Sequence, residues 1–283
     1  MKLSVEYRAE YRYEAKVSLS PHLVRLFPRD ALQARVGSFR FATSKNGPVH
    51  WRHDLFDNTV AQCFYPHDDD RLVFSLDAQI EIEERNPFGF LLDSRALQWP
   101  PEHVSREREV LSAFMKPEQV DWPVPLRPIS GSEMVGALVA MNEWIHTHIA
   151  YERREDGEAH PPAETLRLRR GACRDTAMLL AAALRAQGLA ARLVSGYLWE
   201  STSDPAERKA DGSLHAWTEV FLPGAGWVGM DPSNGVFVDH HYIAAAVGIT
   251  PADIAPVTGL YFGDRKIPHQ LETSLAISRR PDV

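Results

Sequence analysis

Hydrophobic and polar residues partly alternate through the first third of the chain, which is the pattern of half-buried β-strands. Turn-forming residues separate the hydrophobic runs at Asn46-Gly47-Pro48 and at Asp68–Asp70. We interpret the acidic run as a solvated hairpin tip rather than a calcium site, because no glycine and glutamate complete a calcium-binding loop. Short strands joined by polar turns predict an antiparallel sandwich or small barrel. The expected strands are Leu3–Tyr13, Leu23–Phe27, Ser38–Thr43, Thr59–Tyr65 and Arg71–Ile82.

Proline is frequent between Asn86 and Pro128, and Trp99 and Trp122 lie in the same stretch. A helix is expected within it at Glu102–Met115, and the ends of the segment are expected to be extended, because residues that precede proline avoid the α-helical region. We expect it to pack against the protein surface rather than to leave its tryptophans in water. The segment is interpreted as the connection between two domains.

After this connection, the spacing of hydrophobic residues changes from the alternation of strands to the spacing of helices. Ser132 is expected to cap a helix that ends near Ile149 and carries its apolar residues on one face. A second helix is expected from Cys173, and its segment Ala177–Leu184 is apolar nearly all round, as in a helix buried in a core. Gly188 follows in the position of a left-handed helix cap.

Three strand-like runs come next, and a tight turn at residues 223–226 joins the last two of them. The runs are Arg192–Trp199, Leu214–Leu222 and Trp227–Met230. Helices followed by antiparallel strands indicate an α+β arrangement. We therefore expect a β-rich domain at residues 1–100, a connection at 101–130, a catalytic core at 131–245, and a tail at 246–283 with a strand that returns to the β domain.

Composition narrows the class of protein further. The 283 residues are about twice the ~150 residues of a typical domain, which favours two domains. A net charge of −7 supplies no basic surface for nucleic acid. The longest uncharged stretches are shorter than the ~18 apolar residues of a membrane helix, and the N-terminus becomes charged too early for a signal peptide. Only two cysteines are present, Cys63 and Cys173, so a disulfide scaffold is excluded. We expect a cytoplasmic location, where a thiol stays reduced.

Three residues are placed where chemistry is favoured. Cys173 lies at the start of the buried helix, where unpaired backbone N–H groups and the helix dipole stabilise a thiolate. His215 begins one strand and Asp231 ends the next, so they share one end of the sheet if the two strands form a hairpin. A carboxylate beside one imidazole nitrogen orients the ring, and the other nitrogen can face the thiol. The predicted roles are nucleophile for Cys173, base for His215 and orienting group for Asp231.

For the other cysteine, histidine and arginine residues that could be functional, a structural role is also considered. Cys63 lies inside a strand without a partner pattern and is expected to fill the core. His146 and His148 are two residues apart on a helix and do not face one ligand together. His240-His241 are interpreted as a polar loop rather than a zinc site, although Asp239–His241 can still border the cleft. The arginines near Cys173 are either a solvated basic edge or a means of steering acidic substrates, namely Arg167, Arg169, Arg170 and Arg174.

At these residues the chain resembles a known family. The segments GACRDTAMLLAAALRAQGLAARLVSGYL and LHAWTEVFLPGAGWVGMDPSNG are similar to the transglutaminase-like core, with its Gly-x-Cys-x-Asp helix start, His-Ala-Trp strand and Asp-Pro after the third strand. The similarity covers about Ile145 to Asp239. The flanking regions are similar to those of bacterial members regarded as cysteine proteases. The resemblance implies a papain-like core, the triad Cys173, His215 and Asp231, and supporting roles for Gly171, Asp175 and Trp217.

The family includes crosslinking acyltransferases, peptidases, amidases and enzymes that remove glycans from asparagine. We expect acyl transfer through a thioester on Cys173, with the Cys173 backbone N–H as a donor to the oxyanion. Hydrolysis of a peptide or amide is favoured over crosslinking because no added domains or calcium sites suggest a dedicated crosslinker. A non-catalytic peptide-binding module is the alternative from another class. The cleft walls depend on loops such as Glu200–Gly212, and no cofactor or metal is expected.

Overall fold

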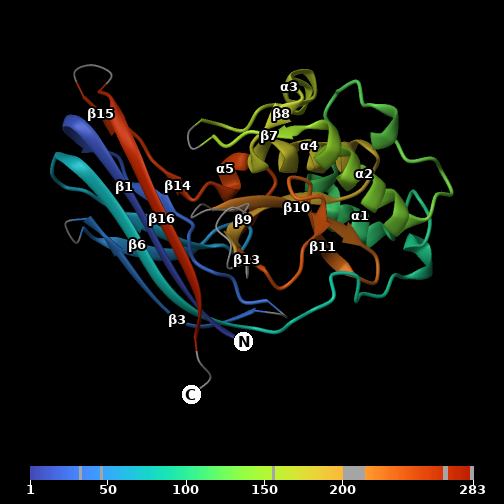
Figure 1. Ribbon diagram of the computed structural model, residues 1–283, viewed down its shortest axis with the longest axis horizontal. Helices are drawn as coiled ribbons and strands as arrows, with labels where there is room; N and C mark the ends of the chain where they lie inside the picture. The colour runs from blue at the N-terminus through green and yellow to red at the C-terminus, as the bar shows by residue number, and fades with distance from the viewer. Residues whose placement is uncertain (32–33, 45–46, 155–156, 200–213, 264–266, 281–283) are drawn as a thin grey trace.

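The computed structural model describes residues 1–31, 34–44, 47–154, 157–199, 214–263 and 267–280 (Figure 1). Its N-terminal part is built on a curled antiparallel sheet with the strand order β15-β1-β6-β3, and β16 also pairs with β1. Alternate side chains of β1, such as Leu3, Val5 and Tyr7, are buried beneath this sheet. The strands are β1 (Lys2–Leu19), β3 (Ala34–Thr43), β6 (Asp69–Ile82), β15 (Tyr261–Phe262) and β16 (His269–Arg280).

A smaller antiparallel sheet packs on the same hydrophobic core in the strand order β14-β2-β5-β4. Cys63, at the end of β5, is fully buried there and fills the core, as predicted. Asp68 and Asp70 are solvent-exposed, as predicted, but Asp69 and Asp70 lie in the first residues of β6 rather than in a turn, and Asp69 pairs with Val17. The strands are β2 (His22–Val24), β4 (Val49–His53), β5 (Thr59–Cys63) and β14 (Val257–Thr258).

The second half of the chain forms a sheet with the order β12-β11-β10-β9-β13, covered by helices on one face. Helix α4 packs directly on the sheet, and the Thr218 hydroxyl in β10 donates to the carbonyl of Ala177 in α4 (2.7 Å). The sheet strands are β9 (Ala191–Leu198), β10 (His215–Leu222), β11 (Gly226–Asp231), β12 (Val236–Phe237) and β13 (Tyr242–Gly248). The helices are α1 (Ser105–Leu111), α2 (Met134–His148), α3 (Pro162–Leu168), α4 (Cys173–Ala186) and α5 (Pro251–Ile254).

Helix α4 is the centre of this core, as its all-round apolar sequence predicts. Side chains from Leu179 to Leu184 are fully buried against α2 and the sheet. Gly188 adopts the predicted left-handed conformation (φ 82°) just after the helix. Helix α2 begins one residue later than predicted, because Glu133 rather than Ser132 caps it by accepting from the N–H groups of Val135 and Gly136.

The connection and the tail join the two halves. Trp99 and Trp122 are nearly fully buried in the core beside α2, so this segment is packed as expected. The predicted helix in the connection is α1 followed by a 3₁₀ turn at Ser112–Met115. Strand β13 crosses the boundary predicted at residue 245, and β16 pairs along most of β1. None of the helices in the described residues is long and apolar enough to span a membrane.

The N-terminal part also braces the sheet of the second half. Figure 1 shows β9 and β13 lying between the curled sheet and the helices. The Tyr197 hydroxyl in β9 donates to the carbonyl of Leu26, and Asn58 exchanges two hydrogen bonds of 2.8 Å with the backbone of Val247 in β13. These contacts hold β9 and β13 against the N-terminal part.

Candidate active site

The start of α4 is fixed by a buried carboxylate. Asp175 is fully buried, and its oxygens accept from the backbone N–H of Ala172 (2.7 Å) and of His160 (2.8 Å). The guanidinium of Arg154 donates to both oxygens at 2.7 and 2.8 Å. Because Ala172 immediately precedes Cys173, this network sets the position of the thiol at the helix N-terminus.

Gly171 is required by the same network. A Cβ on this residue would lie 2.8 Å from the Cβ of Asp175, a closer approach than carbon atoms tolerate. Gly171 also belongs to β8 (Arg170–Gly171), whose parallel pairing with β7 (Ala150–Tyr151) ties the loop before α4 to the chain that follows α2. Two of the supporting residues from the family resemblance, Gly171 and Asp175, therefore shape the backbone before Cys173.

The hairpin of β10 and β11 brings His215 and Asp231 together, as predicted from the turn between them. Thr218 pairs with Met230, which places the start of β10 beside the end of β11. His215 Nε2 and Asp231 Oδ2 are 2.6 Å apart, and His215 is 7% exposed while Asp231 is inaccessible to solvent. Since Nε2 is bound to the carboxylate, Nδ1 is the nitrogen available to the Cys173 thiol.

Asp231 accepts hydrogen bonds from five donors. Its Oδ2 receives His215 Nε2, the side-chain amide of Asn234 (2.7 Å) and the hydroxyl of Tyr242 (2.8 Å). Its Oδ1 receives the backbone N–H groups of Ser233 (2.9 Å) and Asn234 (3.3 Å). A carboxylate that accepts from so many donors is held in its charged form.

The electrostatics of the three residues favour a thiolate and an imidazolium. Burial alone raises the pKa of Cys173, but the hydrogen bond and charge of His215, together with the backbone N–H of Ala216, outweigh it and lower that pKa. Burial alone lowers the pKa of His215, but the charge and hydrogen bond of Asp231 raise it well above its usual value. Burial opposes ionisation of Asp231 too, yet His215 and Tyr242 lower its pKa to about 2. The arrangement can therefore supply a nucleophilic thiolate at neutral pH.

Two aromatic residues complete the surroundings. Trp217 is buried, and its ring meets the Tyr242 ring edge-on with centroids 5.4 Å apart. It supports Tyr242, which in turn holds Asp231. Tyr151 is half exposed in β7, and burial and the nearby charge of Cys173 raise its pKa. Tyr151 is therefore an accessible aromatic group beside the nucleophile.

The arginines that lie near Cys173 in the sequence have separate local partners or roles. Of the arginines near Cys173, Arg167 pairs with Glu164 (2.6 Å) and Arg170 with Glu152 (3.3 Å), and these carboxylates offset their charge. Arg169 has a left-handed backbone (φ 53°) at the end of α3. Arg174 donates to the carbonyl of Arg154 (2.9 Å). The loop Glu200–Gly212 lies outside the described residues.

The histidines considered as candidate ligands lie in two regions, one on α2 and one just before β13. His146 Nδ1 contacts the carbonyl of Ser233 (2.8 Å), whereas the ring of His148 stacks on Trp144 with centroids 4.5 Å apart. Asp239, His240 and His241 come together just before β13, at the end of the sheet that carries His215.

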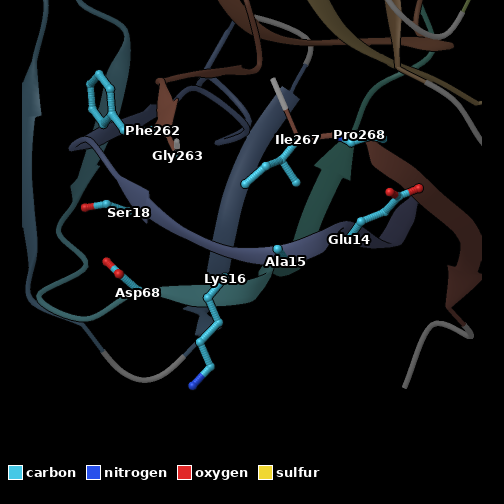
Figure 2. A pocket seen from close by; sticks show the side chains of 9 residues that line it. All are labelled: Glu14, Ala15, Lys16, Ser18, Asp68, Phe262, Gly263, Ile267 and Pro268. Atoms are coloured by element: carbon cyan, nitrogen blue, oxygen red, sulfur yellow. The ribbon is translucent and has the colours of Figure 1, made fainter. Parts of the chain in front are cut away.

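A polar pocket of about 680 Å³ lies away from this site, in the N-terminal part (Figure 2). Glu14, Lys16 and Asp68 supply its charged groups, and Phe262 and Ile267 contribute apolar surface. These side chains, labelled in Figure 2, come from β1, from β15 and from the segments that precede β6 and β16. The lining residues include neither cysteine nor histidine, so the pocket does not compete as a site for thiol chemistry.

Sequence reasoning missed three residues that hold the site together. Arg154 lies in a loop without hydrophobic periodicity, and Asn234 and Tyr242 follow Asp231 in irregular chain and at the start of β13. Asn234, three residues after Asp231, carried a usable signal, because asparagine is frequent in turns, where its side chain forms local hydrogen bonds. No local pattern indicates the roles of Arg154 and Tyr242, which depend on contacts between distant segments.

Comparisons with known proteins identify the family of this chain. The profile of the transglutaminase-like superfamily matches residues 128–232, and that of the bacterial transglutaminase-like N-terminal region matches residues 3–81. An uncharacterized protein of Mycobacterium leprae, ML0607, is 28% identical over 267 residues, covering 93% of this chain and 94% of its own. An uncharacterized protein of Mycobacterium tuberculosis, Rv2569c, is 29% identical over 289 residues, which cover 91% of this chain and 87% of that protein.

A solved structure extends the comparison to the fold. A protein from Cytophaga hutchinsonii, described as a "putative cysteine protease", matches with a TM-score of 0.73 and 15% identity. The match covers 100% of this chain and 92% of that protein. The predicted architecture, a β-rich N-terminal part followed by a papain-like core, is thereby confirmed.

Proposed function

Since the chain belongs to the transglutaminase-like superfamily, we propose that it is a cysteine-dependent enzyme that hydrolyses a peptide or amide bond through a thioester. The observation that carries this proposal is the buried contact of 2.6 Å between His215 and Asp231, with the pKa of Cys173 lowered by the same imidazole. A structural cysteine requires neither the imidazole nor the carboxylate.

The first half of the reaction forms the thioester. The Cys173 thiolate attacks the carbonyl carbon, and the backbone N–H of Cys173 at the start of α4 donates to the developing oxyanion. His215 gives its Nδ1 proton to the nitrogen of the scissile bond, the carbon–nitrogen bond breaks, and the amine leaves. Asp231 keeps the imidazole ring oriented throughout these steps.

The second half returns the enzyme to its starting state. Water gives a proton to His215 while its oxygen bonds to the thioester carbon. The carbon–sulfur bond then breaks, which releases a carboxylic acid and restores the thiolate–imidazolium pair. A primary amine in place of water would form a new amide, which is the crosslinking alternative. We favour water as the acceptor, and the experiment below with an added primary amine decides between the two reactions.

The substrate class and compartment are part of the proposal. The half-exposed ring of Tyr151 beside the nucleophile suits a peptide or protein substrate that contacts an aromatic surface. A reactive thiol works best in a reducing compartment, so we propose the cytoplasm. Nucleic acid and membrane surfaces are not proposed as partners, given the net charge of −7.

A peptide pool tests the reaction directly. Wild-type protein and Cys173→Ala are each incubated with the pool in heavy-oxygen water, with and without an added primary amine, and products are identified by mass spectrometry. Hydrolysis predicts new carboxyl ends that contain heavy oxygen and depend on the thiol. Cys63→Ala serves as the matched control, because this cysteine lies buried in the N-terminal core and its variant should retain turnover.

The outcomes separate the alternatives. Amine-containing products that dominate over acids would favour a crosslinker. Turnover by Cys173→Ala at a rate close to wild type would refute thioester chemistry. A protein that binds peptides from the pool but converts none of them would favour the non-catalytic binding module.

A further inference from the structure

Three metal-ligating side chains converge in the turn between β12 and β13, outside the Cys173 site. His241 Nδ1 lies 3.0 and 3.1 Å from the two oxygens of Asp239, and His240 Nδ1 lies 3.9 Å from Asp239 Oδ2. One nitrogen from each ring and one carboxylate oxygen all lie within 4.8 Å of one another. The pattern of consecutive residues predicted only a polar loop here.

The fold holds these groups in place from two sides. The ring of His241 stacks on Trp199 with centroids 5.2 Å apart and planes inclined by 20°. The backbone N–H of Trp199 donates to the carbonyl of His241 (2.8 Å), which extends the pairing of β9 with β13. The ring centroids of His240 and His241 are 4.2 Å apart. His241 is thus positioned by the sheet and by an aromatic neighbour, not by the turn alone.

One nitrogen of the cluster is left without a partner. His240 Nδ1 is shielded from solvent and has no hydrogen-bond partner among the described residues. Its distance to Asp239 is too long for a hydrogen bond. A buried polar atom that faces a carboxylate across such a gap leaves room for a cation that binds both.

The donor set selects the kind of cation. Two imidazole nitrogens and one carboxylate oxygen form a site typical of zinc with an open fourth position. Metal–ligand bonds of about 2.0–2.2 Å in a tetrahedron separate the ligand atoms by about 3.3–3.6 Å. The distances from Asp239 Oδ2 to His241 Nδ1 and His240 Nδ1, 3.1 and 3.9 Å, lie on either side of this range, and the ligand nitrogens of the two rings lie within 4.8 Å of each other. The three side chains are 17–27% exposed, so water can reach the open position.

We propose that Asp239, His240 and His241 bind one zinc-class divalent ion at the edge of the active-site end of the sheet. The ion would link the two rings to the carboxylate and fix the start of β13. An ordinary histidine–carboxylate pair elsewhere in the chain shows the difference. His53 lies 3.1 Å from Asp57 on the surface, and the described residues place no second imidazole with them.

Zinc titration by calorimetry tests the site. The untagged full chain carries Cys173→Ala, so that the nucleophile cannot act as a ligand and the result does not depend on catalysis. We expect one zinc ion per chain, with affinity weakened at least about tenfold by His241→Ala and similarly by His240→Ala. His53→Ala is the matched control and should leave the affinity unchanged.

Two results would contradict the proposed zinc site. Equal affinities in all three histidine variants would assign the zinc to another place. Absence of saturable binding at millimolar zinc would show that the three groups form only a hydrogen-bonded turn. Circular dichroism of each variant establishes that it is folded, and the two separate histidine variants keep the test decisive if one of them is not.

Discussion

The substitution Asp231→Asn tests how the site sets the charge state of its thiol. Five donors converge on Asp231, two on Oδ1 and three on Oδ2. An amide in either orientation therefore points its NH₂ group at groups that are themselves donors. His215 can relieve this conflict by carrying its proton on Nδ1, so that Nε2 accepts. The ring is then neutral and cannot take the proton of the thiol.

The size of the effect follows from the pKa values. The pKa of Asp231 is lowered from 3.8 to about 2, which corresponds to about 2–3 kcal/mol in favour of the charged carboxylate. This stabilisation is present above the pKa of an unfolded aspartate, about 3.9, and is lost as the pH falls through about 2. Asp231→Asn is thus expected to lower the stability of the protein by about 2–3 kcal/mol at neutral pH, and by less in acid.

The rate of alkylation by iodoacetamide reports the charge state without requiring a substrate. A thiol of ordinary pKa, about 8.5, is deprotonated to only about 0.3% at pH 6. Loss of the ion pair should therefore slow the reaction of Cys173 at pH 6 by about 10- to 100-fold, allowing for the lower nucleophilicity of an acidic thiolate. With a substrate in hand, turnover should fall by up to ~10⁴-fold, by analogy with serine enzymes.

A matched variant isolates the effect of the site. Asp253 also accepts several hydrogen bonds, from the backbone of Ile249 and from Thr250, but it lies at the start of α5. Asp253→Asn should leave the alkylation rate unchanged. An Asp231→Asn protein that is folded and alkylated as fast as wild type at pH 6 would refute the reasoning.

Three further substitutions probe the support of the site. Tyr242→Phe removes one hydrogen bond to the buried Asp231 carboxylate and should destabilise the protein by about 1.5–3 kcal/mol in thermal or urea unfolding; an unchanged midpoint would contradict that bond. Arg154→Met leaves Asp175 buried without its cation, so a loss of about 3–5 kcal/mol is expected, measured in the same way. Gly171→Ala forces a Cβ against Asp175 and should slow alkylation of the thiol at pH 6, whereas Gly188→Ala, far from the thiol, should lower stability alone.

The parts of the site predicted from sequence depend on local signals. Cys173 stands at a helix start, and His215 and Asp231 are the first and last residues of a hairpin, so they lie together at its open end; the tight turn, across which Leu222 pairs with Gly226, sets the strand register. Strand register determines which residues meet, so the contact between the imidazole and the carboxylate follows from the positions of the turn and the strand ends.

The parts that escaped prediction depend on distant contacts or on small local differences. Strand β13 (Tyr242–Gly248) is rich in alanine and buried on both faces, so it lacks the alternation of polar and apolar residues that identifies a strand. Its pairing with β9 could not be predicted from its own residues. The choice of Glu133 over Ser132 as a helix cap involves adjacent residues that both accept hydrogen bonds. Asp69 joins β6 because β1 continues opposite it as far as Leu19.

Ultraviolet absorbance of the thiolate, recorded across the pH range as the difference between wild type and Cys173→Ala, tests the central claim most directly. Cys63 does not interfere, because burial raises its pKa to about 11. The account predicts that the thiolate of Cys173 is already present at neutral pH, paired with the His215 imidazolium, and disappears only in acid. A thiolate that forms only near pH 8.5, as in an ordinary cysteine, would contradict it.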